Sequence, residues 1–194
     1  LIEWAKVLIR EGKIEWVKGN LYSAGDSVIK NDLEYVAKKW KDPSFDLWEE
    51  VDGMHFFTRL AQAESLRQGS DFAKQMGDPG ASDWYWAQMP EITRQLFWHW
   101  DPTINLFWPT PPKSRVGGID YKNSALDISV LLGLLITDGI FIRLSDTRVM
   151  RYAFELEKAF QSLYPINKGS KVPLIGRYPE DKYDGYGTSR ANPW

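Results

Sequence analysis

The sequence predicts an all-α protein whose long loops carry its function. Apolar residues recur at helical spacing in several segments, and loops rich in proline and glycine separate these segments. No segment shows the alternation of polar and apolar residues that marks a convincing strand. The 194 residues, 43% of them hydrophobic, suffice for one substantial core, and the long loop 101–120 is not expected to link separate domains, so residues 1–194 are treated as a single segment.

Six helices are expected, and punctuating residues set their ends. They cover residues 2–17, 26–40, 56–76, 90–100, 124–135 and 145–163. Asp26 or Ser27 can cap the second helix by accepting a backbone N–H, and Pro43 follows its end. The run Gly77-Asp78-Pro79-Gly80 predicts the end of the third helix, and Pro165 follows the sixth.

The apolar positions of these helices define the expected core faces. They are Val28, Leu33 and Val36 in the second helix, Ile128, Leu131, Leu132 and Leu135 in the fifth, and Val149, Ala153, Leu156, Phe160 and Leu163 in the sixth. Loops are expected over residues 41–53, 101–120 and 173–194. The loop 101–120 is rich in proline and contains two adjacent glycines, and long ordered loops of this kind often carry function.

Composition argues against several classes of function. The formal net charge is -2 and the basic residues are interspersed with acids, so no nucleic acid partner is expected. The longest apolar run, 130–136, is far too short to cross a membrane. The sequence contains no cysteine and only His55 and His99 as imidazoles. We therefore expect no metal and no redox cofactor.

Residues 45–55 form an unusual acidic motif, Phe-Asp-Leu-Trp-Glu-Glu-Val-Asp-Gly-Met-His. Four carboxylates and a tryptophan make it too acidic for a core and too aromatic for an ordinary solvated turn. Carboxylates can grip sugar hydroxyls, and an indole can cover the apolar face of a sugar ring. Cleavage of a glycosidic bond also requires a protonated carboxylic acid beside a carboxylate. The motif therefore favours carbohydrate chemistry.

A second motif follows in the loop 176–183, Gly-Arg-Tyr-Pro-Glu-Asp-Lys-Tyr. Together with Leu163-Tyr164-Pro165-Ile166-Asn167 and Asn192-Pro193-Trp194, the two motifs resemble the fungal glucoamylases, family 15 of the glycoside hydrolases. The resemblance covers residues 31–194. One departure is Asp42-Pro43, where the family signature has Ser, Thr or Asn with Gly or Pro.

The resemblance implies a fold and an activity. The fold is an (α/α)6 barrel, of which this chain is an interior segment, incomplete at both ends. The activity is exo-hydrolysis of terminal α-1,4-linked glucose from starch-like glucans or maltooligosaccharides, with inversion to β-glucose and without a cofactor. The resemblance also implies a monomer when full length, placed outside the cell or in the vacuole.

The same resemblance assigns site residues. Glu49 matches the general acid, and Asp46 matches an aspartate described as a proton acceptor. The matching substrate-binding positions are Leu47, Trp48, Glu50, Arg177 and Asp181. The family's glutamate base lies beyond the end of this sequence, so the segment alone is expected to be inactive.

The residues themselves support Glu49 as the acid. It follows Trp48, whose indole excludes water, and it has Asp46 and Glu50 close in sequence; both effects keep a carboxylic acid protonated. Asp46 is harder to accept as the base. Two side chains of one tight loop approach a sugar from the same side, leaving no place for water on the opposite face. We expect Asp46 to tune the acidity of Glu49 instead.

Other assignments stay open at this point. Arg177 and Asp181, four residues apart, can bridge sugar hydroxyls or form a local ion pair. His55 and His99 are expected to be structural, and Glu180 and Lys182 to be solvated charges. Two functions compete with a glucoamylase: another inverting glycosidase on the same barrel, such as a trehalase-like enzyme, and a glycan-binding relative that has lost catalysis.

Overall fold

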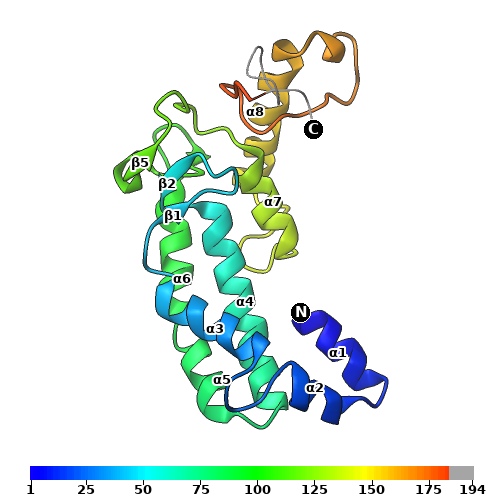
Figure 1. The fold of residues 1–194 in the computed structure, drawn as a ribbon. Coiled ribbons are helices and arrows are strands. Elements are labelled where there is room, and N and C mark those ends of the chain that lie inside the picture. Colours follow the sequence, from blue (N-terminus) through cyan, green and yellow to red (C-terminus); the bar gives the residue numbers. More distant parts are fainter. Residues whose placement is uncertain (184–194) are drawn as a thin grey trace. The chain divides into compact units, whose positions relative to one another are not determined.

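The structure is a computed structural model that describes residues 1–183 (Figure 1). Its backbone falls into two compact units. Unit 1 comprises Leu1–Asp42 and Gln62–Arg94, and unit 2 comprises Pro43–Ala61 and Gln95–Trp194. Among residues 1–183, no helix has both the length and the apolar character that a membrane crossing requires.

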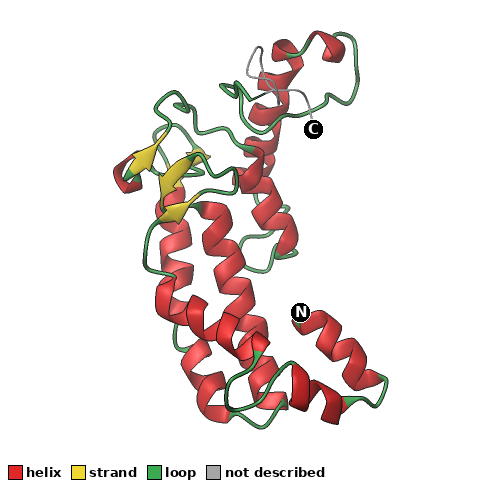
Figure 2. Ribbon diagram, in the orientation of Figure 1, coloured by secondary structure: helices red, strands yellow, loops and turns green. Residues whose placement is uncertain are grey.

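Helices dominate the described chain, and its strands are short (Figure 2). The elements are α1 (Ile2–Arg10), α2 (Ile14–Asn20), α3 (Val28–Lys39), β1 (Ser44–Phe45), β2 (Val51–Gly53), α4 (Phe56–Gln75), α5 (Pro79–Trp86), α6 (Met89–Leu96), η1 (Phe97–His99), β3 (Trp100–Asp101), β4 (Leu106–Phe107), η2 (Pro112–Ser114), β5 (Gly117–Gly118), α7 (Ile128–Ile136), α8 (Thr147–Leu163) and η3 (Pro165–Asn167).

Two predicted helix boundaries in unit 1 are wrong for identifiable reasons. The helix expected over residues 2–17 is broken into α1 and α2, because Gly12 adopts a left-handed φ of 81° between them. Helix α5 is absent from the prediction, because a run that begins with Gly77 predicts only the end of a helix. In fact Asp78 caps α5 and Pro79 occupies its first turn, so the same run ends one helix and begins the next.

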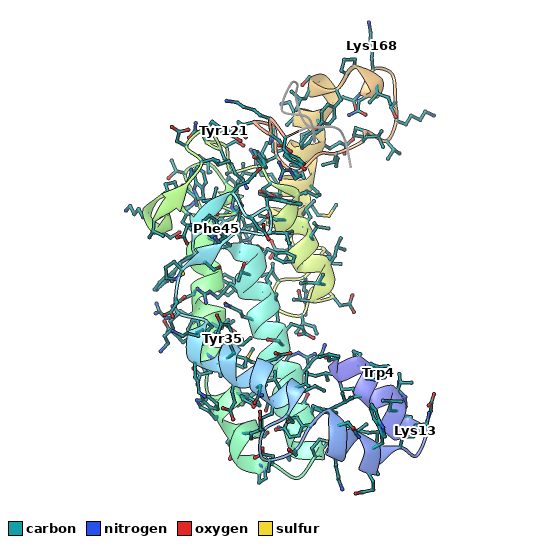
Figure 3. The ribbon with its side chains drawn as sticks, viewed as in Figure 1. Trp4, Lys13, Tyr35, Phe45, Tyr121 and Lys168 are labelled. Carbon is teal, nitrogen blue, oxygen red and sulfur yellow. The ribbon has the colours of Figure 1, made fainter. Side chains whose placement is uncertain are left out.

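Unit 1 is held together by aromatic and charged contacts. Tyr22 and Phe72 pack edge to face with centroids 5.5 Å apart. Trp4 of α1, which Figure 3 labels, meets the ring of Trp16 at 5.9 Å in the same way. In α3 the expected inward residue Leu33 is buried, but Val28 is 51% exposed, so the prediction for Val28 is wrong. The buried face of α3 is instead formed by Ile29, Lys30, Leu33 and Ala37.

The core of unit 2 forms around the start of α4, α7 and α8. Its buried residues are Phe56, Leu60, Leu96, Phe107, Val130, Leu134, Ile142, Val149 and Tyr152. Helix α8 buries Val149, Leu156 and Phe160, as its periodicity predicts. Helix α7 does not follow its prediction, because it starts at Ile128 and leaves Leu135 59% exposed.

The chosen face of α7 was wrong because nearly every residue in this helix is apolar. Its buried side is Ser129, Val130, Gly133 and Leu134. A Cβ on Gly133 would lie 2.9 Å from Leu60 Cδ1 and 3.2 Å from Phe57 Cα, so α7 packs directly against α4 at this glycine. A uniformly apolar helix carries no periodicity from which to choose a face.

Short strands replace two of the predicted loops. Strands β1, β2 and β5 form an antiparallel sheet in that order, with Phe45 opposite Asp52 and Val51 opposite Gly118. Strands β3 and β4 form a separate pair. The sheet joins the acidic motif to the proline-rich loop 101–120, so residues distant in sequence meet where the motif turns.

Candidate active site

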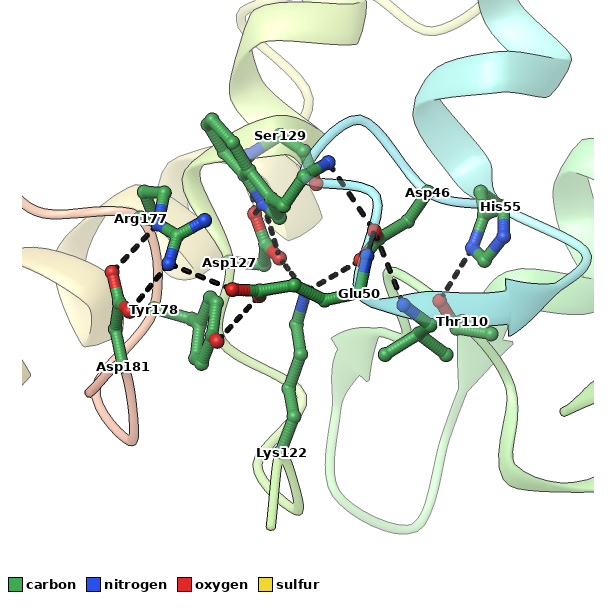
Figure 4. Close-up of polar contacts among 12 residues, drawn as sticks. Asp46, Glu50, His55, Thr110, Lys122, Asp127, Ser129, Arg177, Tyr178 and Asp181 are labelled. Carbon is green, nitrogen blue, oxygen red and sulfur yellow. Dashed lines mark hydrogen bonds and ion pairs between the residues drawn. The ribbon is translucent and has the colours of Figure 1, made fainter. Parts of the chain in front are cut away.

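The acidic motif forms a tight turn between β1 and β2, and Asp46 holds it closed (Figure 4). The Asp46 Oδ1 atom accepts hydrogen bonds from the backbone N–H groups of Trp48 at 3.2 Å, Glu50 at 2.9 Å and Val51 at 3.3 Å. The Asp46 carbonyl accepts from the Glu49 N–H at 3.0 Å. An aspartate that caps its own following backbone in this way fixes the turn without regular structure.

Glu49 lies at the tip of this turn in a strained conformation. Its φ is 60°, in the left-handed region that a residue with a long side chain rarely adopts. The residue is exposed, and within residues 1–183 its carboxylate makes no hydrogen bond or ion pair. Such strain costs on the order of 1 kcal/mol and persists where the surrounding contacts impose it.

Asp46 is buried and carries a negative charge. Its Oδ2 atom lies 3.0 Å from the ammonium of Lys122, and both side chains are almost completely inaccessible. Burial by itself raises the pKa of Asp46, but the attraction of Lys122 and the backbone N–H donors outweigh it and hold that pKa below the ordinary value. Both oxygens of this carboxylate are therefore occupied by donors.

Lys122 also contacts a second buried carboxylate, that of Asp127. The Lys122 ammonium lies 2.5 Å from Asp127 Oδ2 and 4.3 Å from the centre of the Tyr178 ring. The indole Nε1–H of Trp48 donates to both Asp127 oxygens at 3.1 Å. Asp127 in turn caps α7 by accepting from the Ser129 N–H at 2.7 Å. Trp48 is thus tied to the start of α7.

Glu50 lies at the centre of a third group, shown on the left of Figure 4. Its Oε1 accepts from Arg177 Nη2 at 2.9 Å, and its Oε2 accepts from the Tyr178 hydroxyl at 2.6 Å. Arg177 also donates to both oxygens of Asp181, at 2.7 and 2.6 Å. Burial alone would lower the pKa of Arg177. The carboxylates of Asp181 and Glu50 outweigh this effect and raise the pKa above its ordinary value, so the guanidinium stays charged.

The comparisons decide which family this arrangement belongs to. The family model described as glycosyl hydrolases family 15 matches residues 7–194. The chain belongs to glycosyl hydrolase family 15. The chain is 38% identical to the glucoamylase of Blastobotrys adeninivorans, covering 100% of this chain and 33% of that protein. It is also 38% identical to glucoamylase 1 of Rhizopus oryzae, covering 92% of this chain and 29% of that protein.

Solved structures agree with this family. The glucoamylase of Saccharomycopsis fibuligera aligns with a TM-score of 0.77 and 29% identity, covering 87% of this chain and 36% of that one. The glucoamylase of Hormoconis resinae aligns with a TM-score of 0.79 and 27% identity, covering 100% and 31%. The predicted fold class is confirmed: the chain is a mostly helical part of an (α/α)6 barrel. It spans about a third of the length of these relatives.

Arg177 and Asp181 can be compared directly with one of their two expected roles, a local ion pair. They do form an ion pair, but the pair is buried, with 5% and 4% of the two residues exposed. It also reaches Glu50, which lies 127 positions earlier in the sequence. An exposed local pair would contribute little, whereas this one joins the two motifs. The Arg177 guanidinium lies 5.4 Å from the centre of the half-buried Trp48 ring, and Leu47, the residue before Trp48, is 39% exposed.

Glu180 is not the solvated charge that the sequence suggested. Its carboxylate accepts from the backbone N–H of Ser124 at 2.6 Å and from the Ser124 hydroxyl at 2.9 Å. It thereby fastens the second motif to the segment that leads into α7. Lys182 is exposed, as expected, with its ammonium 4.1 Å from the centre of the Tyr121 ring. The motif at 192–194 lies outside the described residues.

Both histidines are structural, as predicted. His55 is buried between the Thr110 hydroxyl and the carbonyl of Ser44, each at 2.7 Å, and burial lowers its pKa. His99 donates from Nδ1 to the Trp108 carbonyl at 2.8 Å, and burial lowers its pKa to about 4. Both rings are neutral at physiological pH. Within residues 1–183, no cluster of three or more His, Asp or Glu side chains could hold a metal ion.

Sequence reasoning missed Lys122, Asp127 and Tyr178. Lys122 lies in an irregular loop and has no local pattern that distinguishes it from a surface lysine. Tyr178 lies inside the second motif, but an uncharged side chain between Arg177 and Glu180 gives no sign in the sequence that its hydroxyl bonds to Glu50. Asp127 offered one usable signal, because an aspartate directly before an apolar run is a good helix cap. The helix predicted to start at residue 124 placed Asp127 inside the helix and not at its cap.

Proposed function

We propose that the full-length protein hydrolyses terminal α-1,4-glucosidic bonds of starch-like glucans, with Glu49 as the general acid. The observation that carries this proposal is the contrast within the acidic turn of a family-15 chain. Both carboxylate oxygens of Asp46 and of Glu50 accept hydrogen bonds, whereas the carboxylate of Glu49 lies on a strained turn without a partner in the described chain. The relatives reported above are named glucoamylases, which supports the substrate class.

In the proposed reaction Glu49 gives its proton to the glycosidic oxygen while the bond from that oxygen to the anomeric carbon breaks. A water molecule attacks the anomeric carbon from the opposite face and loses a proton to a second carboxylate. The α-linked sugar therefore leaves as β-glucose. Inverting enzymes separate their two carboxyl groups by ~6.5–9.5 Å to leave room for the water.

Asp46 is a poor candidate for that second carboxylate. Its Oδ1 accepts from three N–H groups of the turn and its Oδ2 from Lys122, and its side chain is only 6% exposed, so a water molecule has little access to it. Its charge also lies 3.0 Å from a lysine, which weakens its field at Glu49. We propose that Asp46 shapes the turn and tunes the acidity of Glu49 only weakly. The base then lies outside this segment, and the segment alone is inactive.

The proposed sugar ligands surround the turn. Leu47 and Trp48 offer apolar surface, and Glu50, Arg177 and Asp181 offer polar groups for hydroxyls. In Arg177, the Nε and Nη2 atoms are used internally, and Nη1 has no hydrogen bond within residues 1–183. Its two N–H groups are therefore the donors available to a sugar. We expect Glu50 and Asp181 to accept from hydroxyls through their remaining lone pairs.

We further propose a monomer placed outside the cell or in the vacuole. One relative, 31% identical over 87% of this chain, is called an intracellular sporulation-specific glucoamylase of Saccharomyces cerevisiae, so relatives need not share a compartment. Fractionation of cells that make the full-length protein, followed by size-exclusion chromatography, tests both statements.

The decisive experiment measures glucose release from maltoheptaose by the full-length protein, with proton NMR reporting the anomer. We expect β-glucose first, and a loss of about 100- to 10,000-fold in kcat for Glu49→Gln, because the amide keeps the shape but has no proton to give. Glu157→Gln, an exposed carboxylate on α8, is the matched control and should leave the rate unchanged.

Each alternative has its own outcome. Release of α-glucose, or full activity of Glu49→Gln, would contradict the proposed mechanism. Faster cleavage of trehalose than of maltoheptaose would indicate a trehalase-like enzyme. Binding of maltoheptaose without any hydrolysis would indicate a relative that has lost catalysis.

A further inference from the structure

Lys122 connects three separate pieces of the candidate site. Its ammonium contacts Asp46 in the acidic turn at 3.0 Å and Asp127 at the start of α7 at 2.5 Å. It also lies over the ring of Tyr178, whose hydroxyl donates to Glu50. No other described lysine of unit 2 is buried, and Lys122 is only 6% exposed. It therefore links the acidic turn, the start of α7 and the second motif within one buried centre.

The backbone that presents Lys122 is itself fixed. Arg115 donates to the Lys122 carbonyl at 3.0 Å and to the Ile119 carbonyl at 2.5 Å. The Ile119 N–H donates to the Glu50 carbonyl at 2.9 Å, which ties this loop to the turn. These hydrogen bonds fix the backbone of an irregular loop at Lys122 and just before it. A fixed backbone is expected where a side chain must keep its ammonium in one position.

The ammonium of Lys122 neutralises two buried carboxylates that lie close together. Asp46 and Asp127 are two buried carboxylates that both lie within 3.0 Å of the same ammonium. Without it they would face each other in a poorly solvated environment, where like charges repel strongly. The turn would then relieve the repulsion by moving Asp46 away from α7. Trp48, which also bonds to Asp127, and Glu49 beside it would move with the turn.

We propose that Lys122 is a positioning residue of the proposed reaction: its ammonium holds the acidic turn against the start of α7 and so fixes where Glu49 and Trp48 meet the substrate. This inference rests on the proposed function. A displacement of about 1 Å can cost on the order of 100-fold in rate, so the effect should appear mainly in kcat.

The test compares three variants of the full-length protein. Lys122→Met removes the charge and keeps the length of the side chain, and Lys122→Arg keeps the charge. Lys30→Met is the matched control, because Lys30 is also buried, at 9% exposure, and bonds to Asp78 in unit 1. Each variant is assayed for kcat and KM on maltoheptaose and for its melting temperature, with 5-fluorotryptophan incorporated so that the Trp48 signal is read by fluorine NMR.

We expect Lys122→Met to lower kcat by roughly 100-fold, with a smaller rise in KM, and to shift the Trp48 resonance. Lys122→Arg should recover part of the lost kcat. Lys30→Met should lower the melting temperature without changing kcat. If Lys122→Met does not fold, Lys122→Gln replaces it with the same expectations. The inference is wrong if the charge-free variants keep kcat and the Trp48 signal, or if Lys30→Met lowers kcat equally.

The NMR signal separates this inference from the proposed function. If the wild-type protein releases no glucose, the proposed function fails, and the Trp48 resonance still shows whether Lys122 positions the turn. If the wild-type protein is active and the Lys122 variants match it in kcat and in the Trp48 signal, the positioning role fails and the proposed function stands.

Discussion

Two buried lysines of this chain sit in nearly identical surroundings. In unit 1, Lys30 bonds at 2.5 Å to Asp78, which caps α5 and accepts from the hydroxyl of Tyr22. In unit 2, Lys122 bonds at 2.5 Å to Asp127, which caps α7 and accepts from the indole of Trp48. Each centre combines a helix cap, a buried ammonium and an aromatic donor.

The difference lies in the second carboxylate. The second partner of Lys30 is Glu34, one turn away on the same helix, at 3.8 Å. The second partner of Lys122 is Asp46, which belongs to the acidic turn and lies 76 positions away in sequence. The first centre fastens a helix start, and the second also captures the turn that carries Glu49. Buried ion pairs are weak evidence for stability, so the added carboxylate is better explained by positioning.

The largest expected effect comes from the glycine before each centre. Gly118 of β5 and Gly77 both have left-handed φ values, 91° and 83°. A Cβ on Gly118 would overlap the carbonyl of Glu50, whereas a Cβ on Gly77 would meet open space. We expect Gly118→Ala to displace the turn and to lower kcat on maltoheptaose by on the order of 100-fold. Enzyme assays and thermal unfolding of both variants measure the difference.

Gly77→Ala is the matched control for this prediction. It imposes the same left-handed strain of about 1–2 kcal/mol next to Asp78, without the overlap, so it should lower stability and leave kcat unchanged. Equal kcat in the two variants would mean that the sheet beside the acidic turn does not set the position of Glu49.

The two centres also show what the sequence can and cannot predict. The acidic motif, the second motif and most helices could be predicted from the sequence, because local spacing and composition determine them. Helix α8 and its inward residues, for example, follow directly from the apolar spacing. The ion pair between Lys122 and Asp46 could not be predicted from the sequence, because it depends on the pairing of two residues of β2 with two of β5. Glycines at 117 and 118 carry no side-chain pattern that would reveal such a strand.

The family resemblance supplied roles for Glu49, Arg177 and Asp181, but not the contacts among them. The spacing of four residues left a local Arg177–Asp181 ion pair open as one of two roles, and the structure contains that pair. Nothing in either motif indicated that Glu50 would join that pair, because the contact depends on the tertiary fold. Charged residues whose partners are distant in sequence are the part of this site that single-sequence reasoning cannot reach.

The dependence of stability on pH distinguishes the contribution of His99 from those of the two lysine centres. Burial lowers the pKa of His99 from 6.5 to about 4, so its ring is protonated at a higher pH in the unfolded chain than in the folded protein. The contribution of His99 to the free energy of unfolding is therefore fully present above pH 6.5. It decreases by about 3 kcal/mol as the pH falls toward 4. Asp46 and Asp78 have pKa values below the ordinary 3.8, so their contributions are lost only at lower pH.

The variant His99→Asn tests this assignment. Its amide can replace the donor to the Trp108 carbonyl but does not titrate. We expect denaturant unfolding at several pH values to show a flatter profile between pH 6.5 and 4 for the variant than for the wild type. An unchanged slope would assign the acid sensitivity to another group, such as His55, whose pKa burial also lowers below 6.5.

The smallest effect, and the most selective, is expected from neutralising the two caps. Asp127→Asn and Asp78→Asn each keep a cap acceptor and lose the charge that the buried lysine faces, so both should lower stability by about 1–3 kcal/mol. Only Asp127 also accepts from Trp48, so only Asp127→Asn should reduce kcat, by an expected factor of about ten. Denaturant unfolding and the maltoheptaose assay on the same preparations measure both quantities.

The outcome bears directly on why two similar centres coexist in one chain. Equal losses of stability with unequal losses of kcat would show that one arrangement serves folding in unit 1 and both folding and positioning in unit 2. If Asp78→Asn also reduced kcat, the contrast would fail, because unit 1 contains none of the proposed site residues. The proposed role of Lys122 would then have to be attributed to general stability rather than to its contact with the acidic turn.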